Sequence, residues 1–128
     1  THYTYLKKII REALMLDLSD EAVKYSGQLF EIEPKNPTSL QALIDIYFDS
    51  EKQNLLIDFF IDSIEKHNQP EILGNLNFHL GLLYFNLGIE DKADQYIEKS
   101  KEHFETVLPK NHQIFKTIKD YEKERKRA

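Results

Sequence analysis

Mostly apolar positions recur along this chain of 128 residues in three blocks that share one internal spacing. Each block places its key positions three, four and seven residues after the first, which is one face of an α-helix, and a further position follows nine residues later. The blocks are Leu6-Ile9-Ile10-Ala13 with Ala22, Leu40-Leu43-Ile44-Tyr47 with Leu56, and Asn77-Leu80-Gly81-Tyr84 with Ala93. They begin 34 and then 37 residues apart. A helix pair that recurs at this length predicts a stack of helical hairpins.

Seven helices are predicted from the apolar spacing and from residues that start or stop helices. Ser19 is predicted as an N-cap, Asn36 as a second cap before Pro37, and Gly88 as the residue that ends a helix. The predicted helices cover about residues 3–16, 20–33, a segment from 37 that includes Tyr47, 52–67, 70–87, 91–108 and 110–126. No stretch alternates with a period of two, so the fold class is predicted to be all-α.

Composition argues against most catalytic and cofactor sites. The chain has no Cys, which excludes disulfides and thiol-ligated metals, and its five His show no spacing typical of metal ligands. It has neither a Gly-rich phosphate loop nor a Gly-x-Ser-x-Gly motif. Two carboxylate pairs, Asp45 with Asp49 and Asp58 with Asp62, fit a solvated helix face better than acid–base catalysis. We therefore expect no enzyme activity, no metal and no cofactor.

The net charge of −5 is distributed unevenly. The segment from Lys116 onward has six basic and three acidic residues, so the rest of the chain is strongly acidic. An acidic body argues against nucleic-acid binding, which requires a basic face. No apolar run approaches the length of a membrane span. We expect a cytoplasmic protein that binds no membrane, with a targeting segment outside these residues not excluded.

Two segments resemble the tetratricopeptide repeat family. Asp20-Glu21-Ala22, followed by Leu29-Phe30-Glu31-Ile32-Glu33-Pro34-Lys35-Asn36-Pro37, is similar to the family's second helix and closing turn, and Leu80-Gly81-x-x-Tyr84-x-x-x-Gly88 with Asp91-Lys92-Ala93 is similar to its first helix and helix junction. The resemblance covers about residues 3–108. It implies one domain, an α-α superhelix of three helix-turn-helix repeats (about 3–36, 37–70 and 74–108) with a capping helix at about 110–126. Ile10, Ile44 and Leu56 replace small residues of the family pattern, which predicts wider helix packing in the second repeat than in the third.

The resemblance also implies a binding surface, because the first helix of each repeat lines the family's concave groove. The expected apolar anchors are Phe48, Phe78, Leu82 and Phe85, and the expected charged positions are Lys7, Arg11, Asp45 and Asp49. The stripe of Phe78, Leu82 and Phe85 is a second apolar face on a helix that already has one, which favours a surface for a partner. Two alternatives stay open: the last helix or a second copy covers this stripe, and Arg11 pairs with Asp45.

These observations predict a non-catalytic scaffold or adaptor that binds a peptide or helix of a partner protein. A self-association module that joins copies into a homo-oligomer is the main alternative. A further alternative is an accessory tetratricopeptide domain of a larger protein.

Overall fold

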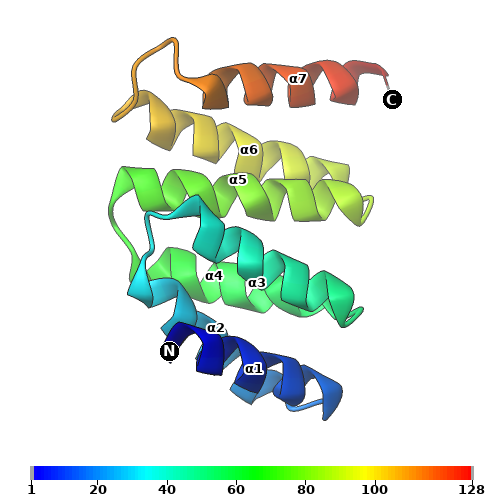
Figure 1. Cartoon of the computed structure of the whole chain (residues 1–128). Coiled ribbons are helices and arrows are strands. Elements are labelled where there is room, and N and C mark those ends of the chain that lie inside the picture. Colours follow the sequence, from blue (N-terminus) through cyan, green and yellow to red (C-terminus); the bar gives the residue numbers. More distant parts are fainter. Residues whose placement is uncertain (1, 128) are drawn as a thin grey trace. The chain divides into compact units, whose positions relative to one another are not determined.

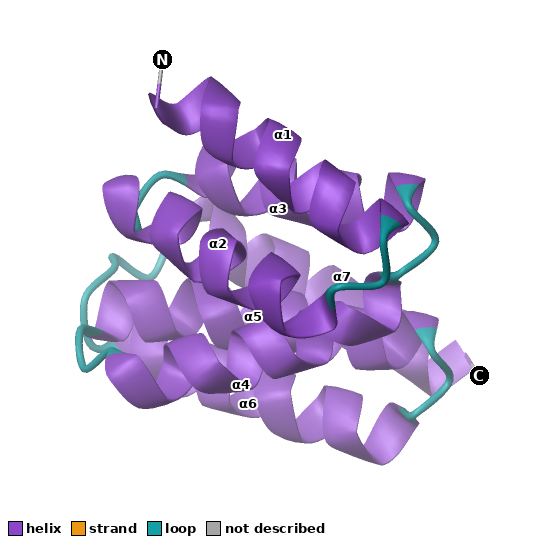
Figure 2. Cartoon of the chain, turned by 90° about the horizontal axis from the view of Figure 1, so that it is seen from below, coloured by secondary structure: helices purple, strands orange, loops and turns teal. Residues whose placement is uncertain are grey.

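A computed structural model describes residues 2–127, and these residues form α-helices, one short 3-10 helix and connecting turns, without any strand (Figures 1 and 2). The elements are α1 (His2–Met15), α2 (Ser19–Ile32), α3 (Pro37–Asp49), η1 (Gln53–Leu55), α4 (Leu56–Lys66), α5 (Pro70–Asn86), α6 (Glu90–Glu105) and α7 (Gln113–Arg127). The prediction of an all-α fold is confirmed over this part of the chain.

The chain divides into two compact units, unit 1 (Thr1–His67) with α1 to α4 and unit 2 (Asn68–Ala128) with α5 to α7. The division lies near the end of the second predicted repeat, and each unit has its own buried apolar side chains. The predicted single domain stays a prediction.

In unit 1, α1 packs against α2 and lies beside α3, while α2 lies beside α4. The core includes Phe30, whose ring meets the edge of Phe59 at a centroid distance of 5.8 Å. A buried polar contact joins α2 to α3: the Ser26 hydroxyl donates to the carbonyl of Ala22 at 2.7 Å and lies 2.6 Å from the Tyr47 hydroxyl. Because serine has one hydroxyl proton, Tyr47 is the donor to Ser26. Burial raises the pKa of Tyr47, so the hydroxyl keeps this proton.

The three turns that join α1 to α2, α3 to η1 and α5 to α6 share one backbone geometry. Each contains a residue in the left-handed region: Asp17 with φ 58°, Glu51 with φ 56° and Gly88 with φ 80°. These residues are 34 and 37 residues apart, the same spacing as the sequence blocks. The repeat predicted from apolar positions therefore recurs in backbone geometry.

The same turns close with equivalent hydrogen bonds. The amide after the left-handed residue donates to the carbonyl five residues earlier, which is the bond of a Schellman motif. The pairs are Leu18 to Ala13 at 2.8 Å, Lys52 to Tyr47 at 2.9 Å and Ile89 to Tyr84 at 2.9 Å. The three acceptors, Ala13, Tyr47 and Tyr84, each occupy the position seven residues after the start of a sequence block. The first helix of each hairpin thus ends at the same repeat position.

Residue size sets how closely the helices of a hairpin approach. Gly74 and Gly81 let α6 approach α5: a Cβ at Gly74 would lie 2.6 Å from the Phe104 ring, and one at Gly81 would lie 2.8 Å from the Ile97 side chain. The backbones of α3 and α4 are farther apart, where the chain has Leu56 in place of a small residue. This difference agrees with the wider packing predicted for residues 37–70 than for residues 74–108, and the repeats themselves stay a prediction.

Several predicted helix ends need correction. Ser19 is the first residue of α2, and Leu18, which has no side chain able to cap, holds the N-cap position. The fourth helix begins with η1, so α4 starts at Leu56 rather than 52. α6 ends at Glu105, before the predicted 108. The amides of Val107 and Leu108 beyond it both donate hydrogen bonds to the carbonyl of Phe104, at 3.1 and 2.8 Å.

Two predicted helix signals are confirmed. The Asn36 side chain accepts a hydrogen bond from the amide of Thr38 at 2.9 Å and caps α3, which begins at Pro37. Gly88 follows the C-cap of α5 with a positive φ.

Replacing Glu51 by glycine is expected to raise the free energy of unfolding by about 0.5–1 kcal/mol, because glycine adopts φ 56° without the steric cost that a side chain imposes. Chemical denaturation followed by far-UV circular dichroism measures this. The control Glu51→Ala removes the same carboxylate but keeps Cβ, so it should give no gain. Equal stabilities for the two variants would contradict the left-handed turn at Glu51.

Candidate partner-binding surfaces

The face of unit 1 formed by α1 and α3 contains five of the predicted groove residues: Lys7, Arg11, Asp45, Phe48 and Asp49, here called the α1–α3 face. Arg11 Nη1 lies 3.9 Å from Asp49 Oδ2, and both side chains are largely exposed. Asp45 instead accepts a hydrogen bond from Gln41 Nε2 at 2.9 Å. The alternative that Arg11 pairs with Asp45 is therefore wrong by one helical turn, because Asp49 faces Arg11.

Exposed apolar side chains lie beside this ion pair. Phe48 is 38% exposed on α3, and Met15 is 78% exposed at the end of α1. Next to them is a pocket of about 430 Å³ lined by Arg11, Leu14, Met15, Asp17, Asp49, Ser50 and Lys52. Lys52 Nζ lies 2.6 Å from Asp17 Oδ1 at its rim. Met15 was not among the residues expected in the groove, although it is far more exposed than its neighbour Leu14, which is 1% exposed.

The apolar stripe predicted on α5 is mostly covered. Phe78 is only 6% exposed, and the half-buried ring of Phe85 meets the edge of Tyr121 from α7 at a centroid distance of 5.5 Å. Leu82 remains 38% exposed. The alternative that the last helix covers the stripe is therefore correct for Phe85. Phe78 is buried, so it cannot serve as a surface anchor.

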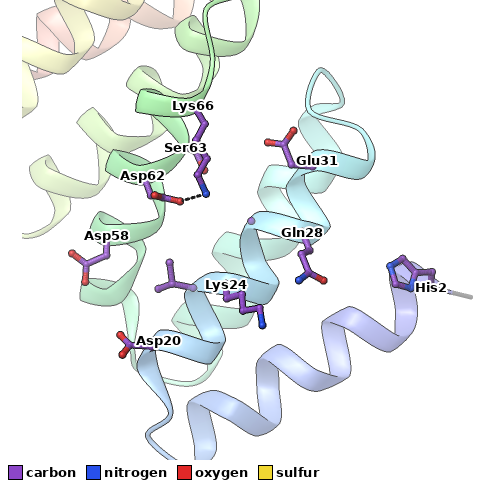
Figure 3. Close-up of a pocket in the computed structure, with 11 residues that line it drawn as sticks. His2, Asp20, Lys24, Gln28, Glu31, Asp58, Asp62, Ser63 and Lys66 are labelled. Carbon is purple, nitrogen blue, oxygen red and sulfur yellow. Dashed lines mark ion pairs between the residues drawn. The ribbon is translucent and has the colours of Figure 1, made fainter.

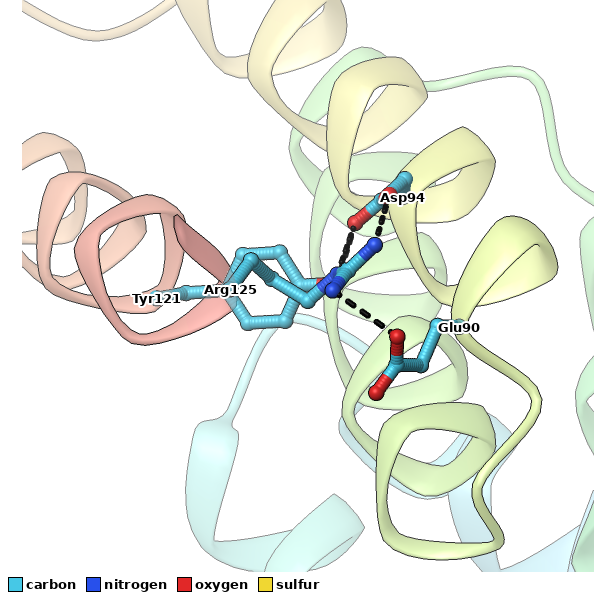
Figure 4. Close-up of polar contacts among 4 residues, drawn as sticks. All are labelled: Glu90, Asp94, Tyr121 and Arg125. Atoms are coloured by element: carbon cyan, nitrogen blue, oxygen red, sulfur yellow. Dashed lines mark hydrogen bonds and ion pairs between the residues drawn. The ribbon is translucent and has the colours of Figure 1, made fainter. Parts of the chain in front are cut away.

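A polar cluster fixes α7 to α6 in unit 2 (Figure 4). Arg125 donates to both carboxylate oxygens of Asp94, from Nε at 2.8 Å and Nη2 at 2.7 Å, and Nη1 lies 3.0 Å from Glu90 Oε2. The Tyr121 hydroxyl donates to Asp94 Oδ1 at 2.8 Å. The hydrogen bonds from Arg125 lower the pKa of Asp94, while burial, and then Asp94 itself, raises the pKa of Tyr121.

The cluster was not anticipated from the sequence, although a signal exists. Glu90 and Asp94 are four residues apart on α6, and Tyr121 and Arg125 are four residues apart on α7, so each pair lies on one helix face. Only the docking of α7, which is a tertiary event, brings the two pairs together.

Arg125→Met keeps the apolar stem but removes the guanidinium, so amide hydrogen exchange within α7 should become faster while that of α5 stays unchanged. Exchange in the wild-type α7 should also quicken as ionic strength rises, because exposed ion pairs are screened by salt. The matched control is Arg127→Met, an exposed arginine of α7 that has no ion pair in the described structure and should leave exchange unchanged. Unaltered exchange in Arg125→Met would show that the cluster does not hold α7.

A second pocket in unit 1, here called the α2–α4 pocket, has a volume of about 910 Å³ (Figure 3). Its lining residues are His2, Asp20, Val23, Lys24, Gly27, Gln28, Glu31, Asp58, Asp62, Ser63 and Lys66. Within it, Lys66 Nζ lies 2.8 Å from Asp62 Oδ2. The sequence identified Asp58 and Asp62 only as a solvated pair, because the pocket depends on α2 and α4 being neighbours.

His79 on α5 is a half-buried ionisable group. Its Nδ1 is buried with no hydrogen-bond partner in the described structure, and the ring lies 5.4 Å from that of Phe78. Burial lowers the pKa of His79 to about 4, because the charged imidazolium loses its hydration. This histidine is therefore neutral at pH 7 and is a structural residue of unit 2.

Stability is expected to depend on pH through His79. Its pKa is about 4 in the folded chain and 6.5 when the ring is fully hydrated, as in the unfolded chain, so only the unfolded chain binds the proton between these values. The contribution of the neutral ring is complete above pH 6.5 and is lost as the pH falls toward 4. From pH 6.5 to 5 the free energy of unfolding should fall by roughly 2 kcal/mol.

Denaturation curves at these two pH values measure the effect, and His79→Leu should abolish most of it. The control His2→Gln removes an exposed histidine and should keep the wild-type dependence. A His79→Leu chain that loses as much stability as the wild type would contradict the burial of this imidazole.

Residues 2–127 contain no group of three or more His, Asp or Glu side chains arranged to hold a metal ion. Over the same residues, no helix combines the length and apolar character required to cross a bilayer. Comparison with known proteins gives no match to a protein-family model, a curated protein or a solved structure.

Proposed function

We propose that this chain is a non-catalytic interaction domain of the tetratricopeptide type, and that its α1–α3 face binds a segment of a partner protein. The observation that supports this most strongly is the exposure of Phe48 and Met15 beside the charged residues of that face. Large apolar side chains exposed next to charged groups are typical of protein-binding surfaces.

The tetratricopeptide assignment is supported by the three equivalent helix turns. It is also supported by Gly74 and Gly81 of α5, which face α6. Turns at Asp17, Glu51 and Gly88 end the first helix of each hairpin at one repeat position. Stacked hairpins of this kind leave the first helices of neighbouring repeats side by side, as α1 and α3 are in unit 1.

The charges on the α1–α3 face favour an amphipathic ligand. Lys7 and Arg11 lie on α1, whereas Asp45 and Asp49 lie on the neighbouring α3. The 3.9 Å separation of Arg11 and Asp49, both well exposed, makes this pair worth little for stability. Both side chains are therefore available to a ligand that presents an acidic residue to α1 and a basic residue to α3.

No chemical step is part of this proposal. Asp45 and Asp49, which are spaced as an acid–base pair could be, have exposed side chains, and catalytic carboxylates act from desolvated clefts. The apolar anchor would supply most of the affinity, and the charges would orient the segment.

A peptide library displayed on phage tests the proposal. Peptides selected on the wild-type chain should share a large apolar residue flanked by opposite charges, and they should lose at least about tenfold in affinity to Met15→Glu/Phe48→Glu. The control Ile61→Glu changes a residue on α4 that is as exposed as Phe48, and it should keep the binding. Circular dichroism verifies that all variants fold. Selected peptides that bind both variants equally would contradict this site.

A further inference from the structure

The two units differ in charge. Residues 1–67 contain twelve acidic and seven basic residues, a net charge of −5, whereas residues 68–128 contain ten of each. Unit 1 therefore carries the whole net charge of the chain, and its surface attracts cationic groups over the Debye length.

The α2–α4 pocket concentrates acidic groups of unit 1. Four of its lining residues are carboxylates, Asp20 and Glu31 on α2 and Asp58 and Asp62 on α4, against two lysines. Asp62 pairs with one of these lysines, and Glu31 Oε1 lies 2.6 Å from Nε2 of His67. Asp20 and Asp58 have no ion-pair partner among the described residues, and Figure 3 shows them toward the same end of the pocket.

Gly27 lies in the wall of this pocket, in the interior of α2. A Cβ at this position would meet no atom within 4 Å, so packing inside the chain does not require glycine. A glycine in a helix interior costs roughly 0.5–1 kcal/mol relative to alanine. Its bare backbone leaves room for another helix to approach α2 closely.

The exposed side of α7 provides a matching cationic surface. Its four exposed lysines follow one line of the helix at spacings of three, four and three, opposite to the side that docks Tyr121 and Arg125: Lys116, Lys119, Lys123 and Lys126, here called the α7 lysine stripe. The stripe is about 15 Å long, and the distance along α2 from Asp20 to Glu31 is about 16 Å. None of the four lysines has an ion-pair partner among the described residues.

From this match in charge and length we propose that the α2–α4 pocket of one copy binds the α7 lysine stripe of a second copy. The chain then self-associates through surfaces distinct from the α1–α3 face. Because most of the groups are exposed, the association is electrostatic and weakens with salt. This inference does not depend on the proposed peptide-binding function.

Analytical ultracentrifugation of the full chain over a range of concentrations, at low and high salt, tests the proposal. The wild type should associate as concentration rises and dissociate as salt is added. Asp20→Lys/Asp58→Lys and Lys119→Glu/Lys123→Glu should each weaken self-association by about tenfold or more. An equimolar mixture of the two variants should associate again. In a mixed pair the basic pocket of one variant meets the acidic stripe of the other, and the native pocket of the second variant meets the native stripe of the first.

Gly27→Gln separates association from folding. It fills the pocket wall without changing charge and replaces a poor helix former, so it should raise the free energy of unfolding and still weaken self-association. A wild type that stays monomeric at every concentration would overturn the proposal, as would association that survives both charge reversals or Gly27→Gln. A monomeric chain whose pocket binds a synthetic peptide of residues 113–127 would also overturn it, and would indicate a basic partner instead.

Discussion

The fold depends first on a backbone hydrogen bond that ends the leading helix of each hairpin. In all three hairpins the amide just after a left-handed residue donates to a carbonyl five residues back, at 2.8–2.9 Å. This bond satisfies a carbonyl that a helix end would otherwise leave unpaired, and it reverses the chain so that the following helix packs on the first. α2 packs on α1 and α6 packs on α5 in this way, and the sequence blocks recur because each block marks a helix that this bond ends.

Side-chain size and the docking of α7 decide which surfaces remain open. Glycines at 74 and 81 allow α5 and α6 to pack closely, and α7 then covers Phe85 through Tyr121 and the Arg125–Asp94 contact. Phe78 is also buried, whereas Met15 and Phe48, at the ends of α1 and α3, stay exposed near the ion pair of Arg11 and Asp49. The distribution of exposed groups thus follows from packing rather than from the apolar pattern alone.

The helices and their repeat were predictable because they depend on local signals. Asn36 and Gly88 act within a few residues of their own helix ends, and the apolar blocks mark the buried faces directly. The buried state of Phe78, the partner of Arg11 and the α2–α4 pocket were not predictable in this way. The Arg11–Asp49 pair and the α2–α4 pocket are set by helices that are distant in sequence, as the Asp94–Arg125 contact is, and helical periodicity contains no information on which helices become neighbours.

Hydrogen exchange followed by NMR tests the recurring hairpin most directly. The amides of Leu18, Lys52 and Ile89 lie beyond the ends of α1, α3 and α5, yet each donates a backbone hydrogen bond. All three should therefore be protected from exchange to an extent close to that of amides within the helices they close. Exchange of these three amides at the rate of unprotected turn residues would contradict the repeated hairpin on which both binding surfaces rest.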